Sequence, residues 1–404
     1  MNFVFLSPHF PSYYWRFCQR LHRHGVRVLG IGDQPYDALL PELRASLTEY
    51  YRVSSLKDYD QLVRACGFFT HKYGRIDRLD SLNEYWLETE AQLRTDFNIY
   101  GIKYPDVLTI KEKLRMKETY RTANIPCARG IPVTTLEAAQ AFVRAVGFPL
   151  IVKPDVGAGA RLTRRIDTQE QLLAFFYEKQ PCAYLLEEFV PGHVVTFEGI
   201  NDYEGRVLFA TSHVYPNESM MEAVNNGRHI AFHSMLPIEE DVQELGRRVL
   251  QVFQTRAHFF HLEFFRLDAD KAGLGKHGDL VGMAVNMRVP GGMITDMMNY
   301  ANDVDVCALW ADMIVYGRLL TPVMDTQYIC GFASRRDHLP YLHSHADILH
   351  AWGPSIQHHL PLPQPMASAM GHYVYLFRAP QLDSIHEITA YIQATDDKNK
   401  LPHR

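Results

Sequence analysis

The chain has 404 residues, of which 47% are hydrophobic and 22% are charged, and its formal net charge is -5. This length is enough for two to four packed units, and the composition is that of a globular protein rather than a disordered one. The acidic balance gives no basic footprint for nucleic acid, and no polybasic run suggests an anionic membrane surface. The apolar stretches are shorter than the roughly 20 residues that span a bilayer. We therefore expect a multi-lobed protein that binds neither nucleic acid nor a membrane.

The amino-terminal stretch MNFVFLSPHF lacks the positive region and the cleavage site of a signal peptide, which favours a cytoplasmic location. The six cysteines are spaced singly with no CxxC pair, so neither a disulfide framework nor a structural zinc site is predicted. We expect them to be buried free thiols. They are Cys18, Cys66, Cys127, Cys182, Cys307 and Cys330.

The first hundred residues alternate between strand and helix patterns. Asn2–Leu6 is a short apolar strand, a helix follows it and stops at Gly25, and a second strand begins at Val26. A further helix contains Leu62 to Cys66, and Ile76–Leu82 is a candidate strand. This βαβ order predicts a small parallel sheet. No GxGxxG follows the first strand, so a dinucleotide site is not predicted here.

From about residue 109 the pattern changes. A helix that ends before the segment NIPCARG carries Lys113 and Lys117 four residues apart, and therefore on one face. Capping-box patterns at Thr134–Glu137 and Thr168–Gln171 begin two further helices.

Between those two helices lies the segment FPLIVKPDVGAGARLTRRI, an apolar strand that ends at Lys153, a small-residue loop and a returning strand. The loop contains Gly157 and Gly159, so its backbone N–H groups can approach phosphate oxygens without obstruction by side chains. The lysine adds a positive charge at the same point. Alone, this loop is a weak signal, because glycine often serves only the geometry of a turn.

The next segment, AYLLEEFVPGHVVTFEGI, contains a strand that ends in Glu187 and Glu188, a connector through Phe189 and Val190, and a second strand that reaches Glu198. A connector between two lobes is a place where adenine can lie, read by main-chain groups and covered by apolar side chains. Taken alone, the two glutamates are typical of a solvated strand end. Their position after the lysine and the loop favours a nucleotide site.

Two further strands, within FFHLEFFRLD and LVGMAVNMRVPGG, bring polar groups to one place. Residues two apart on a strand share a face, so Asn286 and Arg288 are expected to point together, towards Glu263 on the neighbouring strand. An acid, an amide and an arginine are the groups that bind magnesium and a transferring phosphate. Ala284 occupies the position on the same face where a second carboxylate would be most useful.

In this order of motifs the chain resembles the ATP-grasp superfamily, in particular the branch with biotin carboxylase and the large subunit of carbamoyl-phosphate synthase. The resemblance implies an α/β and α+β fold. A Rossmann-like pre-ATP-grasp domain would cover residues 1–108, and a two-lobed ATP-grasp domain residues 109–320, with its lid at about 115–187. A small α+β region would follow at 321–404.

By this resemblance, the cofactors are ATP and Mg²⁺. Lys113 and Lys153 match the two nucleotide lysines, and Gly157 and Gly159 match the mobile loop over the phosphates. The segment Glu187 to Val190, with Glu188 inside it, matches the adenine connector.

The resemblance also implies the metal and catalytic residues. Glu263 and Asn286 match the metal ligands, and Arg288 matches the arginine that steadies the acyl phosphate. The family usually has Glu-x-Asn-x-Arg here, whereas this chain has Ala284 in place of the glutamate, which predicts weaker metal binding. Glu198, Asp279 and Asp296 are the acids that could compensate.

Arg228 lies where such enzymes often line the acceptor pocket, and arginine suits bidentate binding of a carboxylate. An ordinary surface arginine fits the same letters. The expected partners are a small-molecule carboxylate and an amine, and the resemblance allows a homodimer.

Three functions compete at this stage. The first is an ATP-dependent carboxylate–amine ligase that forms a C–N bond through an acyl phosphate, with ADP and phosphate as products. The second is a nucleotide-binding homologue with little or no turnover, favoured by Ala284 alone. The third, a bicarbonate or carbamate kinase, is disfavoured because the chain contains one ATP-grasp unit and no biotinyl domain.

Overall fold

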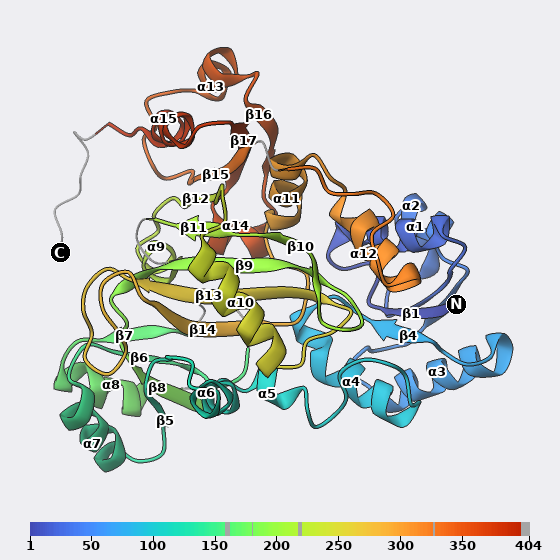
Figure 1. Ribbon diagram of the computed structural model, residues 1–404, viewed down its shortest axis with the longest axis horizontal. Coiled ribbons are helices and arrows are strands. Elements are labelled where there is room, and N and C mark those ends of the chain that lie inside the picture. The colour runs from blue at the N-terminus through green and yellow to red at the C-terminus, as the bar shows by residue number, and fades with distance from the viewer. Residues whose placement is uncertain (158–161, 180, 217–219, 326–327, 397–404) are drawn as a thin grey trace.

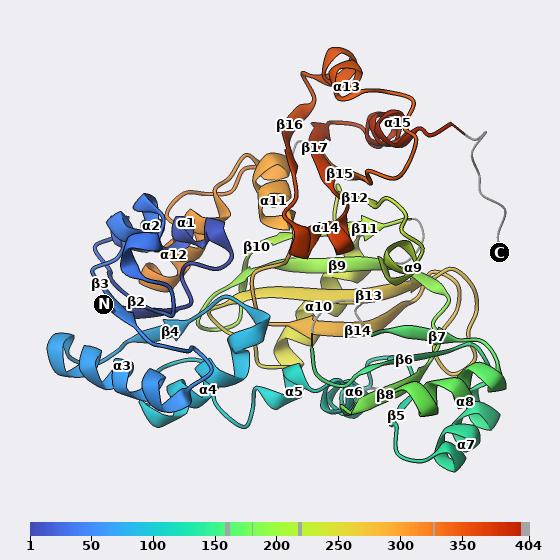
Figure 2. The ribbon, with the colours of Figure 1, turned by 180° about the vertical axis from the view of Figure 1, so that it is seen from behind.

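The computed structural model describes residues 1–157, 162–179, 181–216, 220–325 and 328–396. Its strands form a parallel sheet near the N-terminus, a small antiparallel sheet at the lower edge of Figure 1, and a large central sheet that includes the C-terminal strands. Figure 2 shows the same arrangement from behind. The α/β and α+β fold predicted from the sequence is confirmed.

The N-terminal unit (residues 2–96) is a four-stranded parallel sheet in the order β3-β2-β1-β4. The alternation of strands and helices predicted this arrangement. The candidate strand Ile76–Leu82 is shorter than expected and covers three residues. The strands are β1 (Asn2–Leu6), β2 (Arg27–Gly32), β3 (Glu49–Arg52) and β4 (Arg78–Asp80), and the helices are α1 (Trp15–Arg23), α2 (Pro41–Ser46), α3 (Tyr59–Tyr73) and α4 (Leu87–Asp96).

The lid sheet (β5–β8) is antiparallel, in the order β5-β8-β6-β7, and packs its apolar face against α7 and α8. Thr168 caps α8 as predicted by accepting from Gln171 N–H, but α7 is capped one residue later than predicted. There the Thr135 hydroxyl, not Thr134, accepts from Ala138 N–H at 3.2 Å. The elements are α5 (Leu108–Lys111), α6 (Lys113–Thr122), β5 (Gly130–Pro132), α7 (Leu136–Val146), β6 (Leu150–Pro154), β7 (Arg164–Ile166), α8 (Gln169–Glu178) and β8 (Tyr184–Glu188).

The central sheet (β9–β17) has the order β14-β13-β9-β11-β12-β15-β17-β16, and β10 pairs with β9. Its strands pair antiparallel throughout the described residues, and β15 joins β12, so the sheet continues across residue 321 into the C-terminal region. Its strands are β9 (Gly192–Asn201), β10 (Val207–Thr211), β11 (His213–Tyr215), β12 (Ala231–Ser234), β13 (Phe259–Leu267), β14 (Leu280–Asn286), β15 (Ile329–Arg335), β16 (Ile356–Pro361) and β17 (Tyr373–Ala379).

Seven helices accompany this sheet in the described part of the chain. They are α9 (Met220–Asn225), α10 (Glu240–Val252), α11 (Ile294–Asn302), α12 (Val306–Tyr316), α13 (His345–Trp352), α14 (Gln364–Met370) and α15 (Leu382–Gln393). The sequence predicts that α12 begins at Asp305, and the Asp305 carboxylate does accept from Ala308 N–H.

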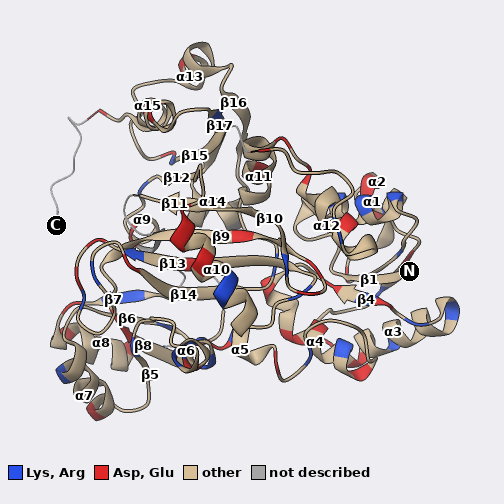
Figure 3. Cartoon of the chain, in the orientation of Figure 1, with Lys and Arg blue, Asp and Glu red and all other residues tan. Residues whose placement is uncertain are grey.

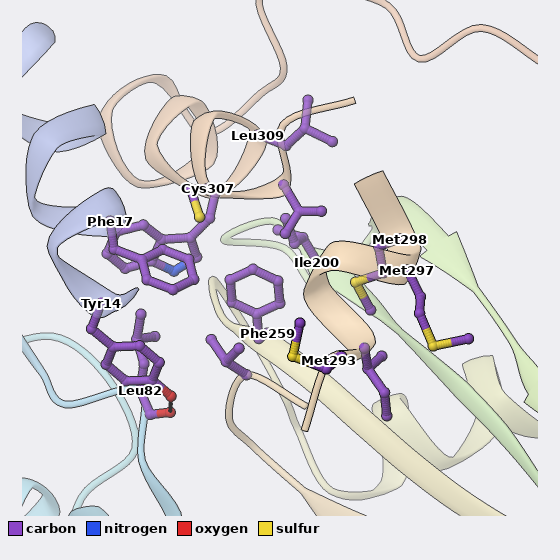
Figure 4. Close-up of a cluster of buried hydrophobic side chains, with 14 of the residues drawn as sticks. Tyr14, Phe17, Leu82, Ile200, Phe259, Met293, Met297, Met298, Cys307 and Leu309 are labelled. Atoms are coloured by element: carbon purple, nitrogen blue, oxygen red, sulfur yellow. Dashed lines mark hydrogen bonds between the residues drawn. The ribbon is translucent and has the colours of Figure 1, made fainter. Parts of the chain in front are cut away.

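One apolar core joins the N-terminal unit to the central sheet. Figure 4 shows Phe17 of α1 beside Phe259 of β13, with methionines of α11 and residues of α12 around them. Trp310 of α12 is fully buried and meets Phe17 edge-on at a ring distance of 5.4 Å. Burial of such large aromatic surfaces holds the two parts together.

The cysteines and the charges are distributed much as the sequence suggests. All six thiols are free, and five of them are buried, but Cys182 is exposed, contrary to the prediction. Lys and Arg positions are interspersed with Asp and Glu positions along the whole ribbon (Figure 3).

Candidate functional site

The predicted acid and amide do lie on paired strands, β13 and β14. Glu263 is directly opposite Ala284, and Asn286 is opposite His261, so these side chains share one face of the sheet. The Asn286 amide donates to the His261 carbonyl at 3.2 Å. Strand pairing therefore places Glu263 and Asn286 in neighbouring cross-strand pairs on one face of the sheet.

Arg288 follows β14 and lies at the end of the same face. Its Nε donates to the Glu84 carboxylate at 3.0 Å, and its Nη1 donates to the Val289 carbonyl at 3.0 Å. Burial would raise the pKa of Glu263, but His261 and, more weakly, the charge of Arg288 lower it. Glu263 is therefore held as a carboxylate within reach of the field of Arg288.

No candidate acid takes the place that Ala284 leaves. Asp279 precedes β14, at the opposite end of that strand from Asn286, and accepts from Lys276 N–H. Asp296 pairs with Arg16 at 3.2 Å. Glu198 lies on the same face as Glu263, but its carboxylate is already engaged by histidines.

Glu198 is fully buried between His213 and His261, and each ring nitrogen Nδ1 meets one of its oxygens. Burial alone would raise the pKa of Glu198, but the two histidines lower it to about 2. Burial alone would lower the pKa of His261, but Glu198 and then Glu263 raise it to about 9. The result is a charged chain of side chains across β11, β9 and β13, directly beside Glu263.

One predicted nucleotide lysine, Lys153, meets Lys117 at the buried carboxylate of Glu187. Lys153 Nζ contacts one oxygen of Glu187 at 2.5 Å, and Lys117 Nζ contacts the other at 2.8 Å. Burial would raise the pKa of Glu187, but Lys117 and Lys153 lower it to about 2. Lys113 donates to the carbonyls of Asp155 and Gly157, at 3.2 and 3.0 Å.

The positive charges of these lysines are therefore concentrated beside the small-residue loop. Burial, and then the charge of Lys153, lowers the pKa of Lys113. Gly157 has φ +122°, a backbone conformation that favours glycine, and no atom lies near the position of a Cβ there. Gly159 lies outside the described residues.

The two glutamates of the predicted connector do not form a solvated strand end, because both are buried in β8. Arg129 donates through two nitrogens to the Glu188 carboxylate, at 2.7 to 3.1 Å. The segment from Phe189 to Pro191 then joins the lid sheet to the central sheet. The buried Val190 side chain lies in an apolar group whose other buried members are Ala128, Leu267, Leu274 and Val281.

Arg228 is placed apart from these contacts. It is exposed in the segment between α9 and β12, and its carbonyl accepts from Arg336 Nε at 2.6 Å. Burial lowers the pKa of His229, and the charges of Arg336, Arg228 and Arg335 lower it further. The position of Arg228 is therefore beside the C-terminal strands.

Two features of the site are not predicted by the sequence analysis. One is Glu84, which reaches Arg288 from the N-terminal unit across 204 positions in the chain. The other is the pairing of Glu198 with His213 and His261. Glu84 follows strand β4 of a parallel sheet, and ligands bind at the carboxyl ends of the strands in open α/β folds. This position in the sequence could have identified Glu84 as a candidate site residue.

Parts of this chain are similar in sequence to proteins of known activity. Residues 112–209 match the family described as carbamoyl-phosphate synthase L chain, ATP binding domain. The L-arginine-specific L-amino acid ligase of Bacillus subtilis is 25% identical over 254 residues, which are 61% of this chain and 59% of that ligase. The carbamoyl phosphate synthase large chain of Clostridium acetobutylicum is 24% identical over 114 residues, 27% of this chain and 11% of that protein. The match thus spans less than two thirds of either relative.

Solved structures match over nearly the whole chain. The L-amino acid ligase from Bacillus licheniformis has a TM-score of 0.68 at 13% identity, covering 96% of this chain and 95% of that one. The biotin carboxylase domain of Hydrogenobacter thermophilus 2-oxoglutarate carboxylase, in complex with MgADP, ADP and bicarbonate, has a TM-score of 0.66 at 13% identity, covering 98% and 90%. Within the described residues, no helix has the length and apolar character needed to cross a bilayer.

Proposed function

We propose that this chain, which has the ATP-grasp fold, is an ATP-dependent ligase that joins a small-molecule carboxylate to an amine through an acyl phosphate. The observation that carries the proposal is the presence of two groups of residues, one basic and one that combines an acid, an amide and an arginine. Lys113 and Lys153 lie beside the small-residue loop, and Glu263, Asn286 and Arg288 lie on and beside β13 and β14.

We assign the nucleotide to the space between the lid sheet and the central sheet. Lys113 and Lys153 would contact its phosphates, and the loop with Gly157 and Gly159 would cover them. The main chain of the connector, from Glu187 and Glu188 to Val190, would read the adenine edge. The buried contacts of Glu187 and Glu188 support a positioning role for both carboxylates.

The donor set of β13 and β14 fits magnesium. Glu263 and Asn286 offer hard oxygen atoms, and magnesium is commonly held by one or two carboxylates together with substrate phosphates and water. When bound, the metal would offset negative charge on the phosphates. A site with Glu263 and without a carboxylate at Ala284 fits one such ion.

The residues of the chain then supply position and countercharge. A carboxylate oxygen of the substrate attacks the γ-phosphorus of ATP, and ADP leaves. Lys153 and Arg288 lie where they would offset the charge that spreads over the transferring group. The amine then attacks the acyl carbon, the bond to the phosphate oxygen breaks, and a C–N bond forms. Closure of the loop would keep water from hydrolysing the acyl phosphate.

The test is ADP release with magnesium, using pooled amino acids and other small carboxylates with amines. The wild-type chain should release ADP in step with the ligated product, and Arg288→Lys should reduce the rate about 100-fold or more, because it loses the planar fork of arginine. Arg164→Lys is the control, since Arg164 is exposed and pairs with the exposed Glu178. Arg288→Lys should still bind ATP.

A second candidate function is nucleotide binding with little turnover, and Ala284 is the observation that favours it. ATP binding without ADP release, across the whole panel of acids and amines, would support this candidate against the ligase.

A further inference from the structure

Glu84 brings a carboxylate from the N-terminal unit to the proposed catalytic arginine. It follows strand β4, and the Asn83 side chain, which accepts from Tyr85 N–H, begins the short helical turn that contains Glu84. The carboxyl ends of parallel strands are where open α/β sheets bind ligands. This edge of the N-terminal sheet therefore meets the end of β14.

The contact with Arg288 leaves part of the Glu84 carboxylate free. Arg288 Nε donates to one oxygen, Oε2, at 3.0 Å, and the side chains of Arg288 and Glu84 are 16% and 19% exposed. Among the described residues, no other hydrogen bond to the Glu84 carboxylate is present. A carboxylate can accept about four hydrogen bonds, so Oε1 can receive a further donor.

Glu84 also interacts electrostatically with a lysine on the proposed nucleotide side of the site. Burial and the charge of Lys153 lower the pKa of Lys113, while Asp155, Glu84 and Glu187 act in the opposite direction. Glu84 therefore contacts Arg288 and acts electrostatically on Lys113, and the acyl phosphate would form near these residues.

The other buried carboxylates of the site are engaged. Glu187 is held by two lysines, Glu198 by two histidines, and Glu263 is assigned to the metal. An amine substrate carries a positive charge near neutral pH and needs a negative partner when it enters a site that is otherwise rich in lysine and arginine.

We propose that Glu84 is the residue that binds the ammonium group of the amine substrate beside the acyl phosphate on Arg288. The ammonium group gives up one proton to water before its nitrogen attacks the acyl carbon. This inference rests on the proposed ligase function and names the substrate class that the N-terminal unit selects, a cationic amine. Uncharged nucleophiles gain nothing from Glu84.

The experiment compares a cationic with an uncharged nucleophile. The first is the amino acid that the pooled assay identifies, and the second is hydroxylamine, which is uncharged near neutral pH and converts an acyl phosphate into a hydroxamate with release of phosphate. Glu84→Gln keeps the shape of the side chain and removes its charge. We expect the KM for the amino acid to rise about 10- to 100-fold, as for loss of a charge-assisted hydrogen bond, while hydroxamate formation changes by less than about threefold.

Glu88→Gln is the matched control, because Glu88 lies one helical turn further on and pairs at the surface with Lys111. It should leave both reactions close to the wild-type rates. Equal loss of both reactions in Glu84→Gln would mean that Glu84 acts only by positioning Arg288, and an unchanged KM for the amino acid would also overturn the inference. If the wild-type chain forms no hydroxamate from any acid, the ligase function fails and the inference fails with it.

Discussion

Ala284 places a methyl group directly across from Glu263, on the face where a second carboxylate would complete a metal site. Loss of one carboxylate removes charge and oxygen ligands, yet magnesium tolerates few protein ligands when substrate phosphates and water complete its shell. The neighbouring carboxylate of Glu198 is occupied by His213 and His261. At the scale of single residues, the proposed metal site therefore has Glu263 as its one carboxylate among the candidate acids.

Restoring the carboxylate should tighten magnesium binding. In Ala284→Glu, two carboxylates would face each other across β13 and β14, and like charges directly opposite are destabilising. We expect the thermal midpoint to fall in EDTA and to rise with magnesium more than in the wild type, with about tenfold less magnesium needed at half-saturation. The measurement is a thermal melt at a series of magnesium concentrations in the presence of ADP.

Leu280→Glu is the control for this change. Leu280 is the first residue of β14 and pairs with Arg266, at the opposite end of the strand from Asn286. An equal magnesium response in both variants would mean that the effect is one of net charge and not of coordination.

At the scale of elements, the charged chain across β11, β9 and β13 depends on strand register. His261 is paired with Glu198, and β11 adds His213 at the other side of β9. Thr196 donates to Glu198 as well, at 2.9 Å. Buried charges that satisfy one another in this way fix the relative positions of three strands.

The stability of the protein should depend on pH because the pKa values of Glu198 and His261 are shifted. The pKa of Glu198 is lowered to about 2, so its contribution is present above its usual pKa and is lost as the pH falls towards 2. The pKa of His261 is raised to about 9, so its contribution is present below its usual pKa near 6.5 and is lost as the pH rises towards 9.

In Glu198→Gln, the partner that raises the pKa of His261 is removed. We expect the wild-type free energy of unfolding to fall between pH 6 and 9 by on the order of 3 kcal/mol, and the variant to lose much less over the same range. Urea unfolding at the two pH values measures both. Glu204→Gln, at an exposed pair with Arg206, should behave as the wild type. An equally steep fall in Glu198→Gln would refute this assignment.

Sequence periodicity was sufficient for the elements and for one part of the site. Alternation predicted that Glu263 and Asn286 share a face, because that information is local to two strands. It could not predict the burial of Glu187, since its partners Lys117 and Lys153 come from other elements.

The same limit applies to contacts between units. Glu84 lies in the segment NEYW, which by itself indicates only the start of a helix, and its partner Arg288 is 204 positions away. The C-terminal strands likewise join the central sheet through the pairing of β15 with β12, which their local patterns do not specify. Long-range register is therefore the part that requires the structure.

At the scale of the whole molecule, the N-terminal unit is fixed to the central sheet by a buried ion network as well as by apolar contacts. His258 Nε2 meets Asp80 at 2.9 Å, and Arg94 donates to Glu90 at 2.9 Å. One carboxylate oxygen each of Asp80 and Glu90 and one ring nitrogen of His258 lie within 4.8 Å of one another. The guanidinium of Arg94 supplies positive charge to both acids. Glu84 follows Asp80 of this network by four residues.

Trp310 should therefore control the stability of both parts together. It is fully buried on α12 and contacts Phe3 and Phe17 of the N-terminal unit at ring distances of 5.6 and 5.4 Å. Trp310→Ala removes this shared surface and should cost about 3–5 kcal/mol. Hydrogen exchange should show that amides of β1 and β13 lose protection by similar amounts, because the apolar core that they share opens as one.

Trp352→Ala provides the comparison, since Trp352 lies in the separate apolar cluster of α13, α15 and β15–β17. Its loss of protection should be concentrated in β16, β17 and α15, with β1 much less affected. If Trp310→Ala weakened β13 and left β1 protected, the two parts would unfold independently. The position of Glu84 beside Arg288 would then depend on the ion network at Asp80 and not on the shared core.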